Sequence, residues 1–303
     1  MEDRYLRYRH LNLYLKEIFG ERTLKICING NFTCPNRDGK CGYGGCIFCS
    51  ENGSGDQLKN ISIKEQITDH INSYRGKRAN KFIAYFQNFT NTYDTIENLK
   101  IKYDEALNTD SRIVGLEVAT RPDCISEEIA ELLERYTNKF YVCVELGLQT
   151  SNDKTAEIIN RGYKTEVFTN AVKILRKHNI NVVVHIIVGL PNENSKDIAN
   201  TINFINKHDI QGIKIHSCYI VDKTKLCDLY KERLYQTITF EYYLEELVYI
   251  ITHLRKDIII HRVSADPPKD LFVAPEWSIH KKKILAELDR KLRINNLYQG
   301  MYA

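Results

Sequence analysis

Strand and helix signals alternate along most of this chain, and the alternation constrains its fold more than any other feature. Short apolar runs rich in β-forming residues lie at 24–28, 81–87, 112–118, 140–148, 181–188 and 211–220. Helical patterns lie between them, at 62–75, 94–107, 126–136, 165–178 and 195–208. The first of these helices opens with Ser62 and Glu65, the sequence of a capping box. Such alternation predicts an α/β fold in which helices pack outside a parallel sheet.

A group of cysteines follows the first predicted strand. Cys34, Cys46 and Cys49 lie in the segment FTCPNRDGKCGYGGCIFCS, where only two residues separate the last pair. Thiolates at this spacing hold zinc or an iron–sulfur cluster. Glycines in the intervening stretch give the backbone freedom to fold back around such a group. The loop also follows the carboxyl end of a strand, where active sites of (βα) barrels gather.

The residues alone leave two metal centres open. A closed zinc site needs four ligands, and Cys27 or Cys41 could complete it. Zinc ribbons usually contain two close cysteine pairs, whereas here only Cys46 and Cys49 form such a pair. Three thiolates with one open coordination position favour a [4Fe–4S] cluster, with Cys27 and Cys41 as non-ligands. A zinc-stabilised RNA-binding module is the alternative.

Composition favours an intracellular enzyme. The 303 residues are enough for one large domain, or for one domain with an appendage. The nine cysteines are an odd number in no regular framework, and no secretory apolar segment opens the chain, so we expect a reducing, cytoplasmic location. The longest apolar run, near 182–190, is interrupted by His185 and is too short to cross a membrane.

Positive charge is concentrated near the C-terminus. The net charge of +4 carries little information by itself. The stretch HKKKILAELDRKLR is locally basic, while Ile284, Leu288 and Leu292 fall on one helical stripe. These features predict an amphipathic helix that docks on the body and exposes its charged face. A phosphate-binding flank is the alternative.

The cysteine loop, with Phe48 just before its last cysteine, resembles the cluster loop of radical S-adenosylmethionine (SAM) enzymes. In that family three cysteines bind three irons of a [4Fe–4S] cluster, and the fourth iron takes the amino and carboxylate groups of SAM. The gap between the first two cysteines is longer than the commonest spacing. The resemblance implies a partial (βα)6 TIM-type barrel at 24–220, after an N-terminal helical segment at 1–23. It also implies a mixed α/β extension at 221–303 that could bind substrate or tRNA.

The resemblance further assigns residues at strand ends to SAM. Gln87 and Asn88 stand where the superfamily has a Gly-Gly-Glu-like segment that binds the SAM amino group. Glu117 lies at the end of the third predicted strand, in LEVATRPD, which is similar to the Glu-Thr-Arg-Pro-Asp segment of the Elongator catalytic subunit family. An acid there could bind the SAM amino group or ribose, and a salt bridge to Arg121 is the alternative.

Four more positions are similar to Elongator-type and coproporphyrinogen-dehydrogenase-type enzymes. The shared phrase Glu-x-Gly-x-Gln implies that Gln149 faces SAM, and Arg161 matches an arginine that could pair with the SAM carboxylate. His185 stands where the coproporphyrinogen enzymes have a SAM-binding aspartate, although a core histidine would fit equally well. Gly189 opens a Gly-Leu-Pro turn that permits close approach of an adenine.

The smaller group that the chain resembles most is the YhcC/YtqA type, which includes an MnmL-like branch. The shared features are the cysteine spacing, the segment ENGSGD and the ending VSADPPKDLFVAPEWS. The resemblance implies an enzyme that uses a 5′-deoxyadenosyl radical to convert the carboxymethylaminomethyl group of the tRNA wobble uridine to aminomethyl. A flavodoxin or ferredoxin would supply the electron. A small-molecule substrate such as a porphyrin precursor is the alternative, and neither a catalytic residue nor the oligomeric state is predicted.

Overall fold

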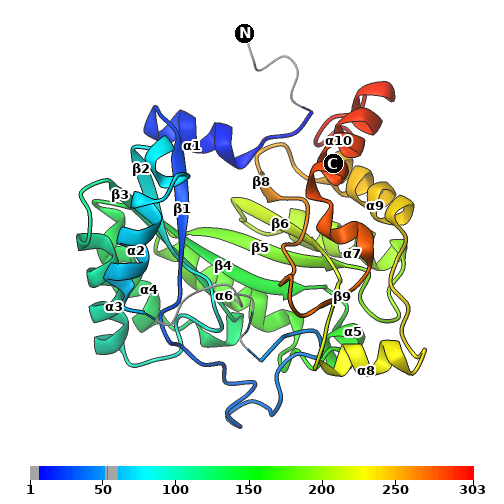
Figure 1. Ribbon diagram of the computed structural model, residues 1–303, viewed down its shortest axis with the longest axis horizontal. Coiled ribbons are helices and arrows are strands. Elements are labelled where there is room, and N and C mark those ends of the chain that lie inside the picture. Colours follow the sequence, from blue (N-terminus) through cyan, green and yellow to red (C-terminus); the bar gives the residue numbers. More distant parts are fainter. Residues whose placement is uncertain (1–6, 52, 54–60) are drawn as a thin grey trace.

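A curled sheet of seven parallel strands forms the centre of the molecule, with helices on its outer side (Figure 1). The structure is a computed structural model and describes residues 7–51, 53 and 61–303. The strand order is β1-β2-β3-β4-β5-β6-β8, while β7 and β9 form a separate antiparallel pair. The strands are β1 Thr23–Ile28, β2 Lys81–Phe86, β3 Ile113–Thr120, β4 Tyr141–Gln149, β5 Asn181–Val188, β6 Gly212–Ser217, β7 Ile220–Val221, β8 Ile259–Arg262 and β9 Phe272–Ala274.

The helices largely follow the sequence pattern. They are α1 Leu11–Phe19, α2 Ile63–Asn72, α3 Ile96–Asn108, α4 Glu127–Thr137, α5 Asp153–Ile158, α6 Thr165–Lys177, α7 Ser195–Asn206, α8 Lys225–Lys231, α9 Phe240–His253 and α10 Lys281–Ile294. The predicted capping box is present, because the Ser62 side chain accepts from the Glu65 backbone and the Glu65 carboxylate accepts from the Ser62 backbone. The predicted α/β partial barrel is therefore confirmed. Its strands and helices end within three residues of the expected positions.

The sheet differs from the expected six units by one strand. β8 pairs in parallel with β6, so a strand from the predicted C-terminal extension belongs to the barrel sheet. The boundary at residue 220 stays a prediction. Helix α1 lies between the two edge strands, β1 and β8. His10, the residue before this helix, forms a parallel β-bridge with Ile260 of β8. The segment ENGSGD falls mostly outside the described residues.

The two faces of the strands have different surroundings. Outward-facing side chains such as Ile26, Leu116 and Val144 pack with the helices in the main hydrophobic core. Barrel interiors of this type usually contain bulky aliphatic side chains. Here the inward positions include Lys25 and Glu145, so the interior is charged.

Candidate active site at the barrel mouth and interior

The cysteine loop lies at the end of the barrel where β1 ends, at the bottom of Figure 1. Its position is set by backbone hydrogen bonds to two helices. The Ile47 amide donates to the Ile159 carbonyl at 3.1 Å, and the Leu226 amide donates to the Ile47 carbonyl at 2.9 Å. A turn in which the Cys49 amide donates to the Cys46 carbonyl at 3.0 Å joins the last two cysteines. The loop is thus fixed between the end of α5 and the start of α8.

The three predicted metal ligands converge in this loop. Burial is the main cause that raises the pKa of the Cys46 thiol to about 12, and the nearby Cys49 and Cys34 thiols add to it. A metal must displace such protons, so its binding would release them. Asn36 Nδ2 also lies 3.8 Å from Cys46 Sγ and can donate to it. Donors of this kind tune metal–thiolate centres. The donor set fits an iron–sulfur cluster.

In the described part of the chain, only the trio of Glu117, Glu145 and His261 has its ligand atoms all within 4.8 Å of one another, and this trio lies inside the barrel. The choice between zinc and an iron–sulfur cluster at the cysteine loop stays a prediction.

The two cysteines that we expect to be non-ligands, Cys27 and Cys41, lie in different parts of the structure. Cys41 is exposed in the loop. Cys27 is on β1, and the charges of Lys214, Arg262 and Lys25 act on it, which places it in the barrel interior. That both are non-ligands stays a prediction, although the position of Cys27 away from the loop supports it.

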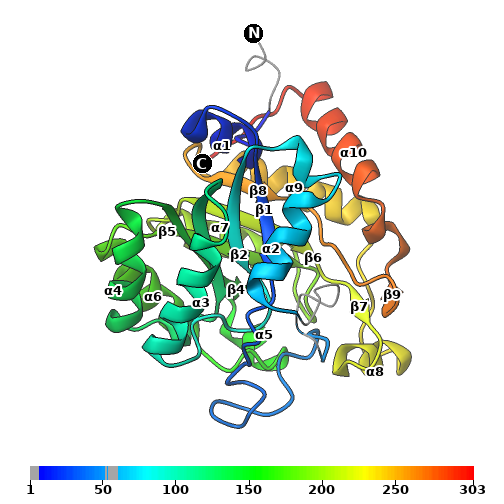
Figure 2. The ribbon, with the colours of Figure 1, turned by 60° about the vertical axis from the view of Figure 1, so that its left-hand side comes forward.

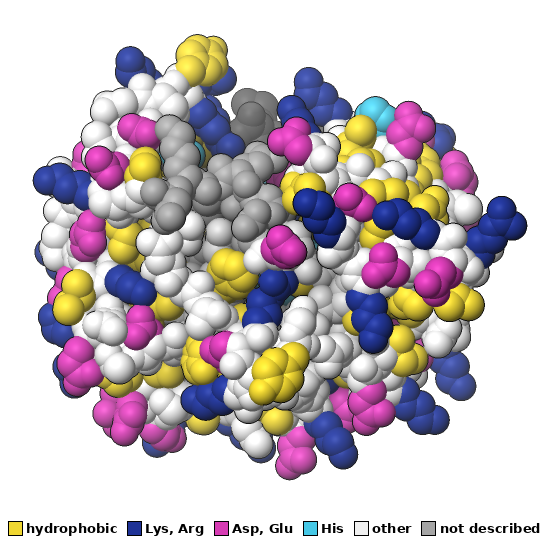
Figure 3. Space-filling view, turned by 60° about the horizontal axis from the view of Figure 1, so that its bottom comes forward, with side chains coloured by type: hydrophobic (Ala, Val, Ile, Leu, Met, Phe, Trp, Pro, Cys, Tyr) yellow, Lys and Arg dark blue, Asp and Glu magenta, His cyan; other side chains and the backbone are white. Residues whose placement is uncertain are grey.

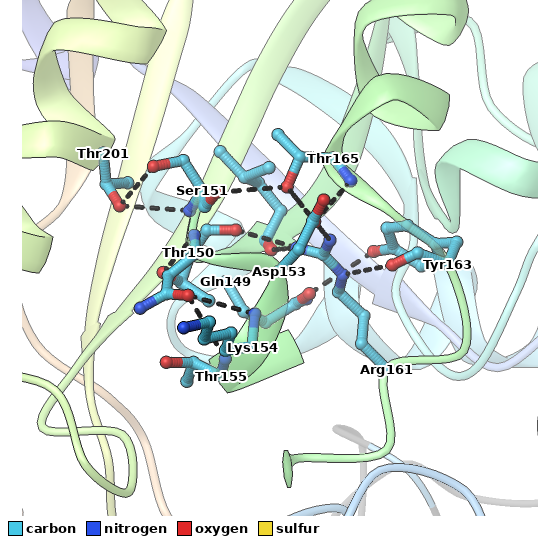
Figure 4. Close-up of polar contacts among 12 residues, drawn as sticks. Gln149, Thr150, Ser151, Asp153, Lys154, Thr155, Arg161, Tyr163, Thr165 and Thr201 are labelled. Atoms are coloured by element: carbon cyan, nitrogen blue, oxygen red, sulfur yellow. Dashed lines mark hydrogen bonds and ion pairs between the residues drawn. The ribbon is translucent and has the colours of Figure 1, made fainter. Parts of the chain in front are cut away.

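At the barrel mouth, Arg161 has all its donors engaged by the chain itself (Figure 4). Its Nη1 donates to the Leu148 and Thr150 carbonyls at 2.6 and 2.8 Å, and its Nε donates to the Tyr163 carbonyl at 3.0 Å. Its Nη2 donates to Asp153 and Thr165, both at 3.2 Å. The side chain is fully buried. This arrangement ties the end of β4 to the loop before α6, and a contact with the SAM carboxylate would require Arg161 to give up one of these bonds.

A second arginine, Arg121, reinforces the same corner. It pairs with Asp123 at 2.7 Å, donates to the Arg161 carbonyl at 2.9 Å and lies 4.9 Å from the centre of the Tyr163 ring. The alternative salt bridge between Arg121 and Glu117 is therefore wrong. Nearby, Gln149 ends β4 with a φ of 60°, and its Oε1 accepts from the Tyr163 hydroxyl at 3.3 Å.

Inside the barrel, Glu145 is the centre of a charged network. Its carboxylate accepts from the Tyr85 hydroxyl at 2.5 Å and from Lys214 at 2.5 Å, and it lies 2.8 Å from His185 Nε2. Lys25 lies 3.4 Å from the same carboxylate. We define the interior network as the inward-facing charged and polar residues around it, which are Lys25, Tyr85, Glu117, Glu145, His185, Lys214 and His261.

Two of the predicted SAM contacts belong to the interior network. Glu117 lies three residues before the end of β3, not at its end, and contacts Lys25 at 2.5 Å. Burial raises the pKa of Glu117 to about 8 and lowers the pKa of His185. The charges of Lys214 and Lys25 instead hold the pKa of Glu145 well below its usual range, against the effect of burial.

Comparison with protein families identifies the chain. The Radical SAM superfamily matches residues 36–205, and the Radical_SAM C-terminal domain matches residues 210–293. The chain belongs to the radical SAM superfamily. Proteins of this superfamily use a [4Fe–4S] cluster with SAM, and the assignment of the cluster to Cys34, Cys46 and Cys49 stays a prediction.

Individual proteins support this assignment. The chain is 36% identical to the uncharacterized protein YtqA of Bacillus subtilis over 299 residues, which cover 98% of this chain and 92% of YtqA. It is also 28% identical to the tRNA uridine(34) acetyltransferase of Methanocaldococcus jannaschii, over 54% of this chain and 30% of that protein. A structure of Elp3 from Methanocaldococcus infernus covers 91% of the chain, and the chain covers 64% of it, with a TM-score of 0.69 at 16% identity. The predicted radical SAM enzyme of YhcC/YtqA type is thus confirmed.

The remaining predicted SAM contacts of this radical SAM protein lie near the mouth. Gln87 and Asn88 directly follow β2, and Gly189 directly follows β5. Gly189 has a φ of 92°, and a Cβ there would lie 2.9 Å from Ile238, so the position needs glycine. Phe48 packs against a small apolar cluster beside the cysteine loop. Contact of these residues with SAM stays a prediction.

Most residues of the interior network were not predicted from the sequence. Lys25 and Lys214 each interrupt an apolar strand, and Glu145 lies on the same face of β4 as Gln149. A charged residue in the middle of a strand that is otherwise buried was the available signal. In addition, none of the helices in the described ranges is long and apolar enough to cross a membrane.

Proposed function

We propose that Cys34, Cys46 and Cys49 bind a [4Fe–4S] cluster and that the enzyme acts on the wobble uridine of tRNA. The observation that carries the proposal is the convergence of three cysteines, with Asn36 directed at Cys46, at the mouth of a radical SAM barrel. When bound, the cluster and SAM would supply a 5′-deoxyadenosyl radical for hydrogen abstraction. The reaction would convert the carboxymethylaminomethyl substituent to aminomethyl.

The names of two relatives support a tRNA substrate. One is a tRNA uridine(34) acetyltransferase, and another is a tRNA-2-methylthio-N(6)-dimethylallyladenosine synthase from Buchnera aphidicola. Position 34 is the wobble position, so the first relative is named for the same nucleotide. Cytoplasmic location and electron supply from a flavodoxin or ferredoxin belong to the same proposal.

The chain's own residues would hold SAM and exclude water. Gln87, Asn88 and Gln149 lie at the ends of strands that border the cysteine loop, where their amides could bind the polar groups of SAM. Gly189 would let the backbone approach the adenine. His185 would act on bound SAM only indirectly, through the interior network, because its Nε2 is already paired with Glu145.

Nucleoside analysis of tRNA tests the proposal. A strain lacking this protein should accumulate carboxymethylaminomethyl-uridine at the wobble position. The purified, anaerobically reconstituted enzyme should convert that tRNA to the aminomethyl form with SAM and a reductant. A deletion strain with an unchanged nucleoside profile, together with SAM cleavage stimulated by a porphyrin precursor, would instead support the small-molecule alternative.

A further inference from the structure

Arg262, the last residue of β8, faces the barrel interior because of an irregularity in the sheet. Between Ile213 and Lys214 of β6, the register with β8 skips one residue, and Arg262 then pairs with Lys214. A bulge of this kind re-aims a side chain relative to the rest of its strand. Paired residues of neighbouring strands lie on the same face of a sheet. Arg262 therefore shares the inner face with Lys214, a member of the interior network.

Solvent reaches the interior beside Arg262, unlike the part around Glu145. The Glu145 side chain is 0% exposed, whereas the side chains of His185 and Arg262 are 22 and 31% exposed. His216 on the inner face of β6 is also half-buried, while its outward neighbour Ile215 is fully buried. The rings of His185 and His216 lie 5.3 Å apart. The two histidines thus form a solvent-accessible wall on the inner face of the sheet, near the arginine.

The fold uses little of the hydrogen-bonding capacity of the Arg262 guanidinium. Its Nη2 lies 2.8 Å from Asp266, which also pairs with Lys281 at 3.1 Å. Within the described ranges this guanidinium donates to no backbone carbonyl, whereas those of Arg161 and Arg255 each donate to several. A guanidinium has five N–H donors in a planar fork. Most of those of Arg262 are therefore available to a ligand.

Positive charge exceeds negative charge in this part of the barrel. Burial raises the pKa of Glu117 to about 8, so this carboxyl group is largely neutral at pH 7. The ammonium groups of Lys25 and Lys214 then face one ionised carboxylate, that of Glu145. Arg262 adds a further cation. A surplus of one sign of charge beside low-dielectric walls attracts a ligand of the opposite sign.

We propose that Arg262 binds the carboxylate of the substrate, beside the wall formed by His185 and His216. The inference deepens the proposed function and rests on it, because the carboxymethylaminomethyl substituent ends in a carboxylate. The planar fork of an arginine can bind both oxygens of such a group. The aminomethyl product lacks the carboxylate, so Arg262 would also distinguish the substrate from the product.

Two small probes test carboxylate recognition without a cluster or tRNA. N-acetylglycine ends in a carboxylate, whereas N-acetylglycinamide ends in an uncharged amide of similar shape. Titrations of the full-length, metal-free protein at low ionic strength, followed by the NMR signals of His185 and His216, should show about 10- to 100-fold tighter binding of N-acetylglycine. Equal binding of the two probes by the native protein would overturn the inference.

Variants assign the preference to Arg262. Arg262→Gln should reduce it to near unity, and an undiminished preference would exclude this residue. The matched control is Arg293→Gln on α10, because Arg293 forms an ion pair of the same spacing with Asp289 at 2.7 Å, and it should preserve the preference. Arg262→Lys keeps the positive charge but loses the fork, so N-acetylglycine should bind about three- to ten-fold more weakly. Native affinity in that variant would contradict binding by the guanidinium.

SAM also contains a carboxylate, and the reconstituted protein separates the two sources. With SAM bound and no reductant, the preference for N-acetylglycine should persist, and Arg262→Gln should leave SAM affinity within about two-fold of native. Loss of the preference on addition of SAM, or ten-fold weaker SAM binding in the variant, would assign Arg262 to the cofactor and overturn the inference. The proposed function fails separately if deletion leaves the tRNA nucleosides unchanged while the native protein still binds N-acetylglycine through Arg262.

Discussion

The mouth and the interior of the barrel both hold buried charges, but they satisfy them in opposite ways. At the mouth, Arg161 donates to three backbone carbonyls and two side chains. In the interior, Lys25 contacts one oxygen of Glu117 at 2.5 Å, and burial raises the pKa of this carboxyl group to about 8. The charge at the mouth is therefore satisfied by hydrogen-bond acceptors of the fold, whereas the interior carboxyl group of Glu117 is neutralised by a proton.

This difference shows that burial alone does not mark a functional charge. Arg161 matches a family arginine by sequence, yet its hydrogen bonds to the protein indicate a structural role. Glu145 and Lys214 were not predicted at all, yet they build the interior network. Counting the free donors and acceptors of each buried group separates the two cases.

The largest expected effect concerns the cysteine loop at the mouth. Cys34→Ala, Cys46→Ala or Cys49→Ala should each abolish the [4Fe–4S] absorbance and SAM cleavage after anaerobic reconstitution, because an open-site cluster needs all three thiolates. Cys27→Ala, in the interior, and Cys41→Ala should retain both properties. Complete loss of metal in Cys41→Ala would indicate four-thiolate ligation instead.

The next effect tests Arg161 as a brace. Arg161→Gln should lower the free energy of unfolding by about 3 kcal/mol, because buried carbonyls of Leu148 and Thr150 lose their donors. Urea unfolding measures this, with Arg135→Gln on the exposed side of α4 as the control. Native stability combined with SAM affinity weakened ten- to a hundred-fold would show that Arg161 serves the cofactor.

A smaller effect tests the charge of Glu117. The raised pKa of about 8 means that the folded protein keeps a proton which the unfolded chain has lost at neutral pH. The free energy of unfolding should therefore fall as pH rises from 6.5 to 8.5, and Glu117→Gln should remove on the order of 1 kcal/mol of this fall.

The pH window follows from the neighbouring histidines. Burial lowers the pKa of His185, His216 and His261, so below pH 6.5 these groups gain protons only on unfolding. In that range they make the free energy of unfolding rise with pH, which is opposite to the effect of Glu117. Urea unfolding of metal-free protein at pH 6.5, 7.5 and 8.5 measures the difference. Identical slopes in native protein and variant would mean that Glu117 is ionised throughout.

The smallest effect is expected at α10, far from both regions. In both ribbon views α10 lies at the end away from the cysteine loop (Figures 1 and 2), and Lys281 is paired with Asp266 at 3.1 Å. Replacing Lys281, Lys282 and Lys283 by glutamine should lower tRNA affinity by less than about three-fold and change the salt dependence by at most about one phosphate contact. A loss of about three contacts would establish α10 as the phosphate clamp.

The face on the cysteine-loop side is another surface that tRNA could contact. There, positive and negative side chains are interspersed over the exposed loops (Figure 3). Lys154 of α5 and Lys225 of α8 lie on the helices that flank Ile47. The same salt-dependence measurement on Lys154→Gln with Lys225→Gln would show whether tRNA contacts this end instead.

The alternating elements and the cysteine loop could be predicted because their signals are local. Helix starts such as Ser62 are encoded within one turn, and strand runs such as Val182–Val184 show their burial in consecutive residues. The ligand spacing of Cys46 and Cys49 is equally local. These features needed no knowledge of distant parts of the chain.

The charged interior and the seventh strand were decided by tertiary structure. Lys25 and Glu117 are 92 residues apart, and only the curvature of the sheet brings the inward faces of β1 and β3 to one point. β8 joins the barrel because the edge of β6 is available for pairing. This pairing is long-range, and the short sequence of β8 does not specify it. Sequence alone thus determined the elements and the cysteine loop, whereas the fold decided which charges are buried together and how each of them is satisfied.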